Sequence, residues 1–473
     1  MKEDIIGRKK EVAELERLYQ SNKSEFIAVY GRRRVGKTFL IKQLFEKELV
    51  FSVTGLANQN TSKQLKNFHN TLKMYDKSPN AAPKDWIDAF DLLIQYLQKI
   101  DGRKAILIDE LPWMDTPRSG FIAALEHFWN GWASMRKDIM LIVCGSASSW
   151  IMDKLINSHG GLHNRITKRI LLKPFNLAET EEMLQSIGMD LSRYEVAETY
   201  MIMGGIPFYL SMFNPAISLS QNIDALFFNE DRSLSNEFEN LYASLFRNSD
   251  NYIKVVTALS KVRNGMAREE IEKESGIDTG GTLSKILSNL EACGFIRKYD
   301  NIGKDSRKKY YQLMDFFTLF YFHFISGNDI RNGFWSAIQG TSTFYAWAGI
   351  SFEMMALLHV GQIKQKLGIS GILTEEFAWR KENSGTVRGA QIDLVIHRSD
   401  KTVNLCEMKF SEDTYTIDYE ESLKLRNRLT AFKATFNKPC NSVQLTFVTT
   451  FGLTKGKHSG IAQNEVILDD LFA

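Results

Sequence analysis

The chain has little cysteine, and its cysteines are not spaced as metal ligands usually are. Cys144, Cys293, Cys406 and Cys440 are scattered over 473 residues without a CxxC pair, which disfavours a zinc site. Three of them lie in apolar or strand-like stretches. We therefore expect buried free thiols in a reducing compartment.

Long apolar runs and a strong excess of charge are also missing. No stretch reaches the ~18 uninterrupted apolar residues of a membrane helix, so no membrane span is predicted. The nearest candidate, FFTLFYFHFISG, predicts a buried aromatic helix. The start, MKEDIIGRKKEVAEL, does not look like a signal peptide, which favours a cytoplasmic location. Because the net charge is only +3, any surface that binds nucleic acid must be local.

What the sequence does contain is a phosphate-binding motif, GRRRVGKT, at residues 31–38. EFIAVY before it predicts a strand, and TFLIKQLFE after it has helical periodicity, which is the setting of a P-loop. Glycines there let successive N–H groups point at phosphates. We expect Lys37 to reach the β- and γ-phosphates of ATP and Thr38 to hold Mg²⁺. The predicted binding set is Gly31, Arg32, Arg33, Arg34, Val35, Gly36, Lys37, Thr38 and Phe39.

Two further apolar runs end in polar residues that suit ATP hydrolysis. AILI ends in Asp109 and Glu110, the Walker B arrangement, in which Asp109 orients Mg²⁺ and Glu110 is the general base. DIMLIVCG is followed by Ser146, whose hydroxyl would contact the γ-phosphate or the attacking water. A plain turn serine is the alternative interpretation of Ser146.

These segments, with IIGRKKEVAEL, GLHNRITKRILLKPF and GGIPFYL, resemble the archaeal-type P-loop ATPases of the AAA+ fold, close to the signal-transducing (STAND) branch. The resemblance implies that Ile6, Gly7 and Arg8 lie near the adenine or ribose, and that Pro207 lies near the adenine in a helical lid. It implies that Arg165 is an arginine finger, acting in cis or on a neighbouring subunit. Without the resemblance, Arg165 is one charge on a solvated strand edge.

The sequence of the middle of the chain predicts a helical lid followed by a DNA-binding module. Three helices and a two-stranded hairpin follow from about residue 246, which is the winged-helix order. The third helix offers Thr282, Ser284 and Lys285, and the hairpin offers Lys304, Arg307, Lys308 and Lys309. Such a hairpin would contact DNA phosphates. A protein-interaction module is the alternative.

The C-terminal third predicts a second site. Strands GAQIDLVIHRS and TVNLCEMKF carry Asp393 and the pair Glu407 and Lys409, and residues two apart in a strand share a face. With Glu353 on a preceding helix, the pattern resembles the PD-(D/E)xK nucleases, a domain that the N-terminal family commonly carries. The resemblance implies that Asp393, Glu407 and Lys409 are catalytic, that Asp393 and Glu407 bind a metal, and that Glu353 is a further ligand. Gln391 and Lys424 are expected near the cleft.

The predicted fold class is α/β. Residues 1–175 form a P-loop AAA+ core with a parallel sheet, 176–245 a helical lid, 246–325 an α+β winged helix, and 326–473 an α/β restriction-endonuclease-like domain. The predicted function couples ATP binding and hydrolysis to DNA binding and to Mg²⁺-dependent DNA cleavage, in a protein that self-associates. The alternative is a STAND-like switch, set by ATP or ADP, with an inactive nuclease-like domain.

Overall fold

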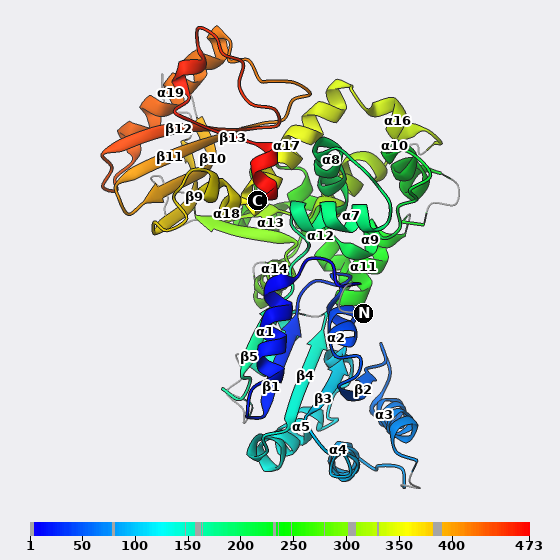
Figure 1. Cartoon of the computed structure of the whole chain (residues 1–473). Helices are drawn as coiled ribbons and strands as arrows, with labels where there is room; N and C mark the ends of the chain where they lie inside the picture. Colours follow the sequence, from blue (N-terminus) through cyan, green and yellow to red (C-terminus); the bar gives the residue numbers. More distant parts are fainter. Residues whose placement is uncertain are drawn as a thin grey trace. The chain divides into compact units, whose positions relative to one another are not determined.

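The computed structural model describes residues 4–77, 81–146, 148–156, 162, 164–229, 233–234, 236–246, 248–278, 280–300, 309–328, 331–381 and 390–473. The chain divides into two compact units (Figure 1), Met1–Pro174 and Phe175–Ala473. We refer to them as unit 1 and unit 2.

Unit 1 is built on a parallel sheet. Its described strands are β1 (Glu25–Tyr30), β2 (Leu49–Thr54), β3 (Lys104–Asp109), β4 (Ile139–Gly145) and β5 (Lys168–Leu171), in the order β2-β3-β4-β1-β5. Every pair of neighbours is parallel. Strands β1, β3 and β4 are buried along almost their whole length, which explains why they read as near-continuous apolar runs in the sequence.

Helices supply the apolar faces that cover this sheet. They are α1 (Lys9–Tyr19), α2 (Lys37–Leu44), α3 (Thr61–Tyr75), α4 (Trp86–Leu97), α5 (Phe121–Gly131) and α6 (Ser148–Ile151). One core cluster joins α3, α4 and α5 to alternate strand residues such as Ile106 and Ile108. The intervening residues, Ala105 and Leu107, are buried as well. Burial of both alternate sets is expected for a parallel sheet with helices on its two faces.

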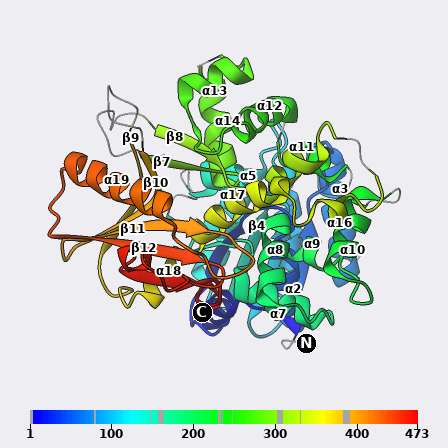
Figure 2. The same cartoon turned by 90° about the horizontal axis from the view of Figure 1, so that it is seen from above.

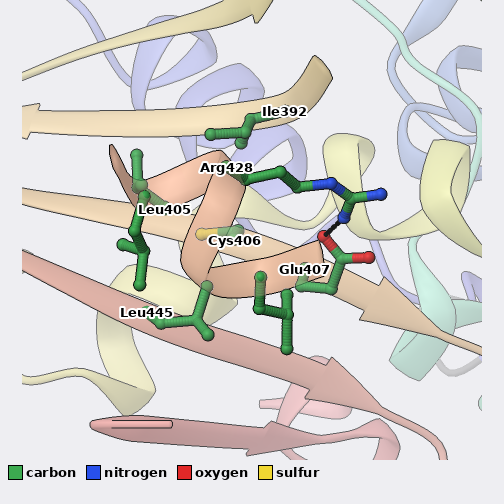
Figure 3. A pocket seen from close by; sticks show the side chains of 8 residues that line it. Ile392, Leu405, Cys406, Glu407, Arg428 and Leu445 are labelled. Carbon is green, nitrogen blue, oxygen red and sulfur yellow. Dashed lines mark hydrogen bonds and ion pairs between the residues drawn. The ribbon is translucent and has the colours of Figure 1, made fainter. Parts of the chain in front are cut away.

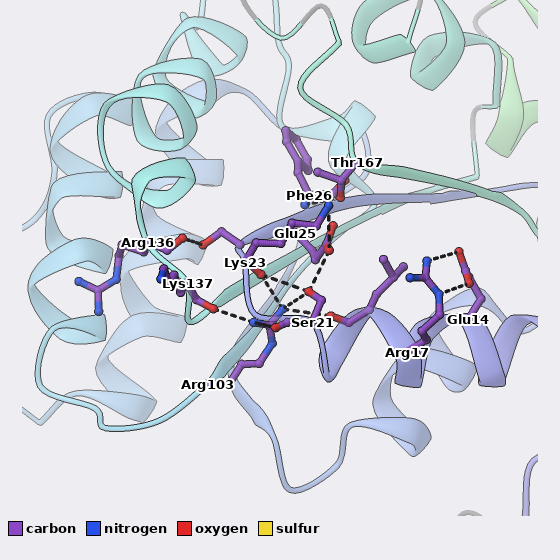
Figure 4. Close-up of polar contacts among 12 residues, drawn as sticks. Glu14, Arg17, Ser21, Lys23, Glu25, Phe26, Arg103, Arg136, Lys137 and Thr167 are labelled. Carbon is purple, nitrogen blue, oxygen red and sulfur yellow. Dashed lines mark hydrogen bonds and ion pairs between the residues drawn. The ribbon is translucent and has the colours of Figure 1, made fainter.

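One arginine ties together the loops at the amino ends of the strands (Figure 4). Arg103 precedes β3 and donates to the carbonyl oxygens of Leu18, Ser21, Lys23 and Lys137 at 2.7–3.1 Å. Burial lowers the pKa of Arg103, but its four carbonyl partners satisfy the charge. These contacts hold together the loops at the edge of the sheet where β3 begins.

The sequence anticipated β1, β3 and β4 but not β2. β2 has the sequence LVFSVT and alternates between buried and less buried positions, so it lacks the continuous apolar run that marks its neighbours. Two helices, α3 and α4, follow β2 before the chain enters β3.

Unit 2 begins with helices. They are α7 (Leu177–Ser186), α8 (Arg193–Met203), α9 (Pro207–Leu210), α10 (Leu219–Ile223) and α11 (Glu237–Leu245). Capping boxes start α7 at Asn176 and α8 at Ser192, because an N-cap oxygen and a glutamate three residues later satisfy backbone N–H groups that have no helical partner.

Helices and a small sheet follow, in an order that the sequence largely anticipated. The elements are α12 (Ser249–Ser260), β6 (Met266–Ala267), α13 (Arg268–Ser275), α14 (Gly281–Ala292), β7 (Ile296–Asp300) and β8 (Lys309–Leu313). The described strands form a sheet in the order β6-β8-β7, with both pairings antiparallel. We refer to residues 249–313 as the αβ module. β6 is two residues long, too short for a sequence pattern to reveal it.

An aromatic segment leads from this module to the last sheet. FFTLFYFHFI forms α15 (Phe316–Phe320) and a π-helical turn (Tyr321–Ile325), and several of its phenylalanines are fully buried. The predicted buried aromatic helix is thus confirmed. Next come α16 (Phe334–Ile338), α17 (Ser342–Leu358) and α18 (Val360–Lys366).

The last sheet is mixed. Its described strands are β9 (Thr374–Lys381), β10 (Ala390–Arg398), β11 (Thr402–Lys409), β12 (Ser442–Thr449) and β13 (Asn464–Ile467), in the order β13-β12-β11-β10-β9. β9 to β11 pair antiparallel, and β11 to β13 pair parallel. Helix α19 (Tyr419–Thr435) covers one face through Leu425 and Phe432 (Figure 2), and α17 packs against β11.

Among the described residues, no helix has both the length and the apolar character needed to cross a bilayer. All four cysteines are free, and Cys144, Cys293 and Cys406 are buried. Burial raises the pKa of the Cys406 thiol to about 12, so this thiol is inert at neutral pH.

Candidate functional site

The loop between β1 and α2 has the backbone of a phosphate cradle. Gly31 has φ 145° and Gly36 has φ 87°, a region that favours glycine. A Cβ at Gly31 would lie 2.2 Å from the carbonyl oxygen of Leu172, so no side chain fits there. The loop ends at Gly36, and α2 begins at Lys37. The N–H groups of the first turn of a helix therefore face the loop.

Lys37 and Thr38 are held where a triphosphate would need them. The Lys37 ammonium donates to the carbonyl oxygens of Gly31 and Arg32 at 2.9 and 2.8 Å, and it is 5% exposed. The Thr38 hydroxyl donates to Oδ2 of Asp109 at 2.8 Å. Burial raises the pKa of Asp109, and the Thr38 hydrogen bond opposes that shift. A hydroxyl and a carboxylate brought together are oxygen ligands of the kind Mg²⁺ prefers.

The end of β3 positions Glu110 beside Ser146. Glu110 has φ 47°, a left-handed conformation that is uncommon for a residue other than glycine and is found disproportionately at functional sites. The Ser146 hydroxyl donates to Oε1 of Glu110, and the Ser146 N–H donates to Oε2 at 3.4 Å. The sequence predicted that Ser146 contacts the γ-phosphate or the attacking water, and that role stays a prediction. The structure adds that Ser146 binds both carboxylate oxygens of Glu110, the predicted general base.

The other N-terminal residues of the predicted site take different positions. Arg8 is buried and donates to the carbonyl oxygen of Val35 at 3.2 Å, which places residues 6–8 against the P-loop. Arg33 and Phe39 are exposed, Phe39 by 54%. Arg165 is exposed in unit 1. Pro207 begins α9 in unit 2, and its role at the adenine stays a prediction.

The C-terminal residues come together from separate elements. Glu353 on α17, Asp393 on β10 and Glu407 on β11 form what we refer to as the carboxylate cluster. Burial, then the nearby Asp393 carboxylate and, more weakly, Glu407, raise the pKa of Glu353 to about 7. Gln391 donates to Oδ1 of Asp393 at 2.5 Å.

Lys409 and Arg428 each contact one oxygen of the Glu407 carboxylate, and Figure 3 shows the Arg428 contact. Lys409 Nζ lies 3.0 Å from Glu407 Oε1 and 3.0 Å from a carboxylate oxygen of Glu421. Arg428, on α19, donates to Glu407 Oε2 at 2.6 Å. Burial lowers the pKa of Lys409, but the Glu407 carboxylate outweighs it, so the net shift is upward. The ammonium stays charged at any physiological pH.

The αβ module adds cations to the same place. Arg263, in the turn before β6, donates from Nε and from Nη2 to the two oxygens of Glu353, the first at 3.2 Å. Asp393 and Glu407 also raise the pKa of Arg263. Burial lowers the pKa of Arg297, on β7, and the Asp393 carboxylate opposes that shift. Strand β7 packs against β9.

The carboxylate cluster, as arranged, does not fit a metal ion. Among the described residues, no group of three or more His, Cys, Asp or Glu side chains is gathered closely enough to hold one. Glu353 is paired with Arg263, and Glu407 with both Lys409 and Arg428. Cations therefore occupy oxygens of Glu353 and Glu407, while Asp393 accepts a hydrogen bond from the neutral Gln391 amide.

Sequence reasoning missed Arg263, Glu421 and Arg428 at this cluster. It named the helix that carries Glu421 and Arg428 but chose Lys424, which is exposed. Glu421, Leu425 and Arg428 share a face at helical spacing, and Leu425 is buried, so the amphipathic pattern of α19 could have pointed to Arg428. Nothing in the sequence marks Arg263. Of the hairpin cations, Lys304, Arg307 and Lys308 lie outside the described residues, and Lys309 begins β8.

Known proteins match parts of this chain. Residues 5–213 match a family described as an ATPase domain predominantly from Archaea. An uncharacterized protein of Methanocaldococcus jannaschii is 25% identical over 414 residues, covering 86% of this chain and 88% of that protein. An uncharacterized ATP-binding protein of the same organism is 49% identical over 46 residues, 10% of this chain and 78% of that one.

Solved structures are also similar. A Walker-type ATPase of Pyrococcus abyssi is 18% identical, with a TM-score of 0.46 over 67% of this chain and 95% of the other. The ORC2 protein of Aeropyrum pernix is 13% identical, with a TM-score of 0.42 over 66% and 92%.

Proposed function

We propose that this protein binds and hydrolyses ATP at the P-loop of unit 1, and that its nucleotide state controls how unit 2 engages DNA. The observation that carries the first part is the arrangement of Lys37, Thr38 and Asp109. Lys37 is folded onto two loop carbonyls, and Thr38 is bonded to the acid that ends β3. Phosphate oxygens would replace the carbonyls as partners of the ammonium, with little movement of the backbone.

Each residue of this site has a role that its contacts support. Thr38 and Asp109 would hold Mg²⁺, which neutralises charge on the β- and γ-phosphates when bound. Glu110 would accept the proton of the attacking water, and Ser146 would fix the rotation of that carboxylate. Arg8 would brace the loop from outside. Arg165, exposed in unit 1, would act on a neighbouring subunit.

The αβ module supports the proposed contact with DNA. Its order of helices and strands fits a winged helix, and Thr282, Ser284 and Lys285 are all exposed on α14. The buried residues Leu283, Ile286 and Leu287 fix the opposite face of that helix in the core. A helix with one polar exposed face suits insertion in a major groove.

Nucleotide binding is tested by Lys37→Ala, with Lys42→Ala, one turn further along α2, as the control. We expect Lys37→Ala to lose ATP affinity by at least ~100-fold, since the ammonium is the charged partner of the phosphates. Isothermal titration with ATP and Mg²⁺ measures it. Wild-type affinity in Lys37→Ala would overturn the phosphate cradle.

The pair formed by Arg263 and Glu353 favours a second candidate function, a nucleotide-controlled switch without cleavage. The αβ module supplies Arg263 to Glu353 of the carboxylate cluster, so this module and α17 are joined by an ion pair. In such a switch, ATP binding would change this docking, and the output would be partner binding.

Arg263→Ala tests the switch. Lys261→Ala is the matched control, because Lys261 lies only two residues from Arg263 in the sequence but pairs with Glu274, outside the carboxylate cluster. Hydrogen exchange across residues 249–313 should rise in Arg263→Ala and in wild type with ATP, but not in Lys261→Ala. No change with either would exclude the switch.

Plasmid cleavage decides between the two candidates. Supercoiled plasmid is incubated with Mn²⁺, with and without ATP, beside Lys409→Ala. If the wild type cuts the plasmid and Lys409→Ala does not, the result supports nuclease action. If neither the wild type nor Arg263→Ala cuts the plasmid, the result favours the switch.

A further inference from the structure

A hollow in the last sheet of unit 2 gathers basic side chains from two elements. Helix α19 contributes Arg426 and Lys433, and the segment before β13 contributes Lys457 and His458. The hollow has a volume of about 340 Å³. We refer to it as the basic hollow. It is large enough for a phosphate group with its sugar.

No acidic residue lines the basic hollow. Elsewhere in the same part of unit 2, some basic residues have carboxylate partners. Lys364 pairs with Glu376, Lys366 with Asp470, Arg398 with Asp400, and Lys438 with Glu375. Within the described part of the chain, the cations of the hollow form no ion pair of this kind. Like charges gathered without counter-charges repel one another, and this arrangement favours an anionic ligand.

The lining favours a polymer over a small nucleotide. The apolar residues of the hollow, Leu429, Val443 and Ile461, are only partly buried, and no aromatic ring that a base would stack on lines it besides His458. Lys424 on α19 and Lys455 in the preceding loop are exposed and extend the positive charge beyond the hollow. An open basic surface of this kind fits a chain of repeating phosphates.

Helix α19 connects the basic hollow with the carboxylate cluster. Arg426, Leu429 and Lys433 lie at helical spacing on one face, while Arg428 reaches Glu407 from another. Leu429 also lines the small cavity beside Arg428 and Glu407 (Figure 3). Val443 pairs with Val403, four residues before Glu407 on β11, a separation of about 13 Å at ~3.3 Å per strand residue. That is about four nucleotide steps at ~3.4 Å each.

We propose that the basic hollow binds the phosphate backbone of a nucleic acid and directs that strand along α19 towards the carboxylate cluster. Binding itself is independent of the P-loop. Only the direction towards the cluster rests on the proposed role of unit 2 in engaging DNA.

The test neutralises the hollow and measures duplex binding. The triple variant Arg426→Gln, Lys433→Gln, Lys457→Gln is compared with Lys63→Gln, Lys66→Gln, Lys73→Gln, which removes the same charge from exposed positions of α3 in unit 1. Both are made in the Lys37→Ala background, so that the P-loop takes no phosphate. Fluorescence anisotropy with a labelled duplex, over a series of salt concentrations, gives the affinity and its salt slope. Thermal unfolding checks that both variants fold.

We expect the hollow variant to bind about tenfold or more weakly at ~100 mM salt, and the slope of log affinity against log salt to fall by about 2 to 3. The control should keep the affinity and slope of its parent. An unchanged slope in the hollow variant would overturn the proposal. So would competition by inorganic phosphate at the concentration of the duplex phosphates, since that result would identify a site for a single free anion.

Failure of this proposal and failure of the ATPase proposal are distinguishable. If Lys37→Ala keeps full ATP affinity, the proposal that the P-loop binds ATP is wrong, while duplex binding still tests whether the basic hollow binds nucleic acid. If the hollow variant binds duplex like its parent, the hollow assignment falls while ATP binding is untouched.

Discussion

The P-loop site of unit 1 and the carboxylate cluster of unit 2 both combine acids with a lysine, although Asp109 ends β3 whereas Glu353 lies on α17. In unit 1, Asp109 and Glu110 are held by the hydroxyls of Thr38 and Ser146. In unit 2, Glu353 and Glu407 are held by guanidinium groups. A hydroxyl leaves the charge of a carboxylate in place, whereas a guanidinium neutralises it. The acids of the first site are therefore bound by neutral groups, whereas Glu353 and Glu407 in the second are paired with cations.

The largest expected effect is on ATP hydrolysis at the P-loop site. Glu110→Gln removes the proposed base but leaves the P-loop intact, so ATP binding should persist while turnover falls by ~100-fold or more. Phosphate release under saturating ATP measures it. Ser146→Ala should lower turnover less, because it removes only the group that orients Glu110. Undiminished hydrolysis in Glu110→Gln would remove Glu110 from the base role.

A smaller effect concerns the stability of the closed cluster. Arg428→Ala leaves Glu407, which is mostly buried, with Lys409 alone, and should lower the free energy of unfolding by about 2 kcal/mol. Lys424→Ala, on an exposed position of the same helix, should change it by less than ~0.5 kcal/mol. Urea unfolding of both variants gives the two values. Equal losses would mean that the Arg428 contact adds no stability.

The pH dependence of stability sharpens the comparison further. The pKa of Glu353 is about 7 in the folded protein, against 4.5 ordinarily. Between those values the folded state keeps a proton that the unfolded state releases, so this group destabilises the fold as pH rises from about 4.5 to 7. Glu353→Gln should flatten that part of the curve. Thermal unfolding across this range measures it, and an unaltered slope would contradict the raised pKa.

Glu198 provides the matched case without an arginine. Burial raises its pKa to about 7 as well, and Gln339 donates to it at 2.7 Å. Glu198→Gln should flatten the same range, but without the change in hydrogen exchange of residues 249–313 that loss of the Arg263 partner is expected to cause.

The smallest expected effect tests whether subunits complete the P-loop site. Arg165→Ala should leave activity unchanged at low protein concentration and lower it only where wild-type activity per subunit rises with concentration. Turnover measured across a dilution series gives the answer. A concentration-independent loss would mean that Arg165 acts within its own chain.

The nucleotide site could be predicted almost entirely from local sequence. Gly31, Gly36 and Lys37 lie in one loop, and Asp109 ends a continuous apolar strand, so their spacing carries the chemistry. The cluster in unit 2 was predicted in part. The pattern of β10 and β11 indicated Asp393, Glu407 and Lys409, and the structure pairs Lys409 with Glu407; their action together with Glu353 stays a prediction. Arg263 was missed because it comes from an element far away in the sequence, whereas Arg428 lies on a helix whose amphipathic pattern could have indicated it.

The sequence by itself determined the P-loop, the buried strands and the acids at their ends, since these depend on backbone conformation and on apolar periodicity over a few residues. Only the tertiary structure decided which cations face the carboxylates of unit 2. Side chains as distant in sequence as Arg263 and Glu353 meet through the packing of whole elements. A local sequence pattern does not indicate which charged residue such packing will place beside a carboxylate. The same packing left the cations of the basic hollow without acidic partners.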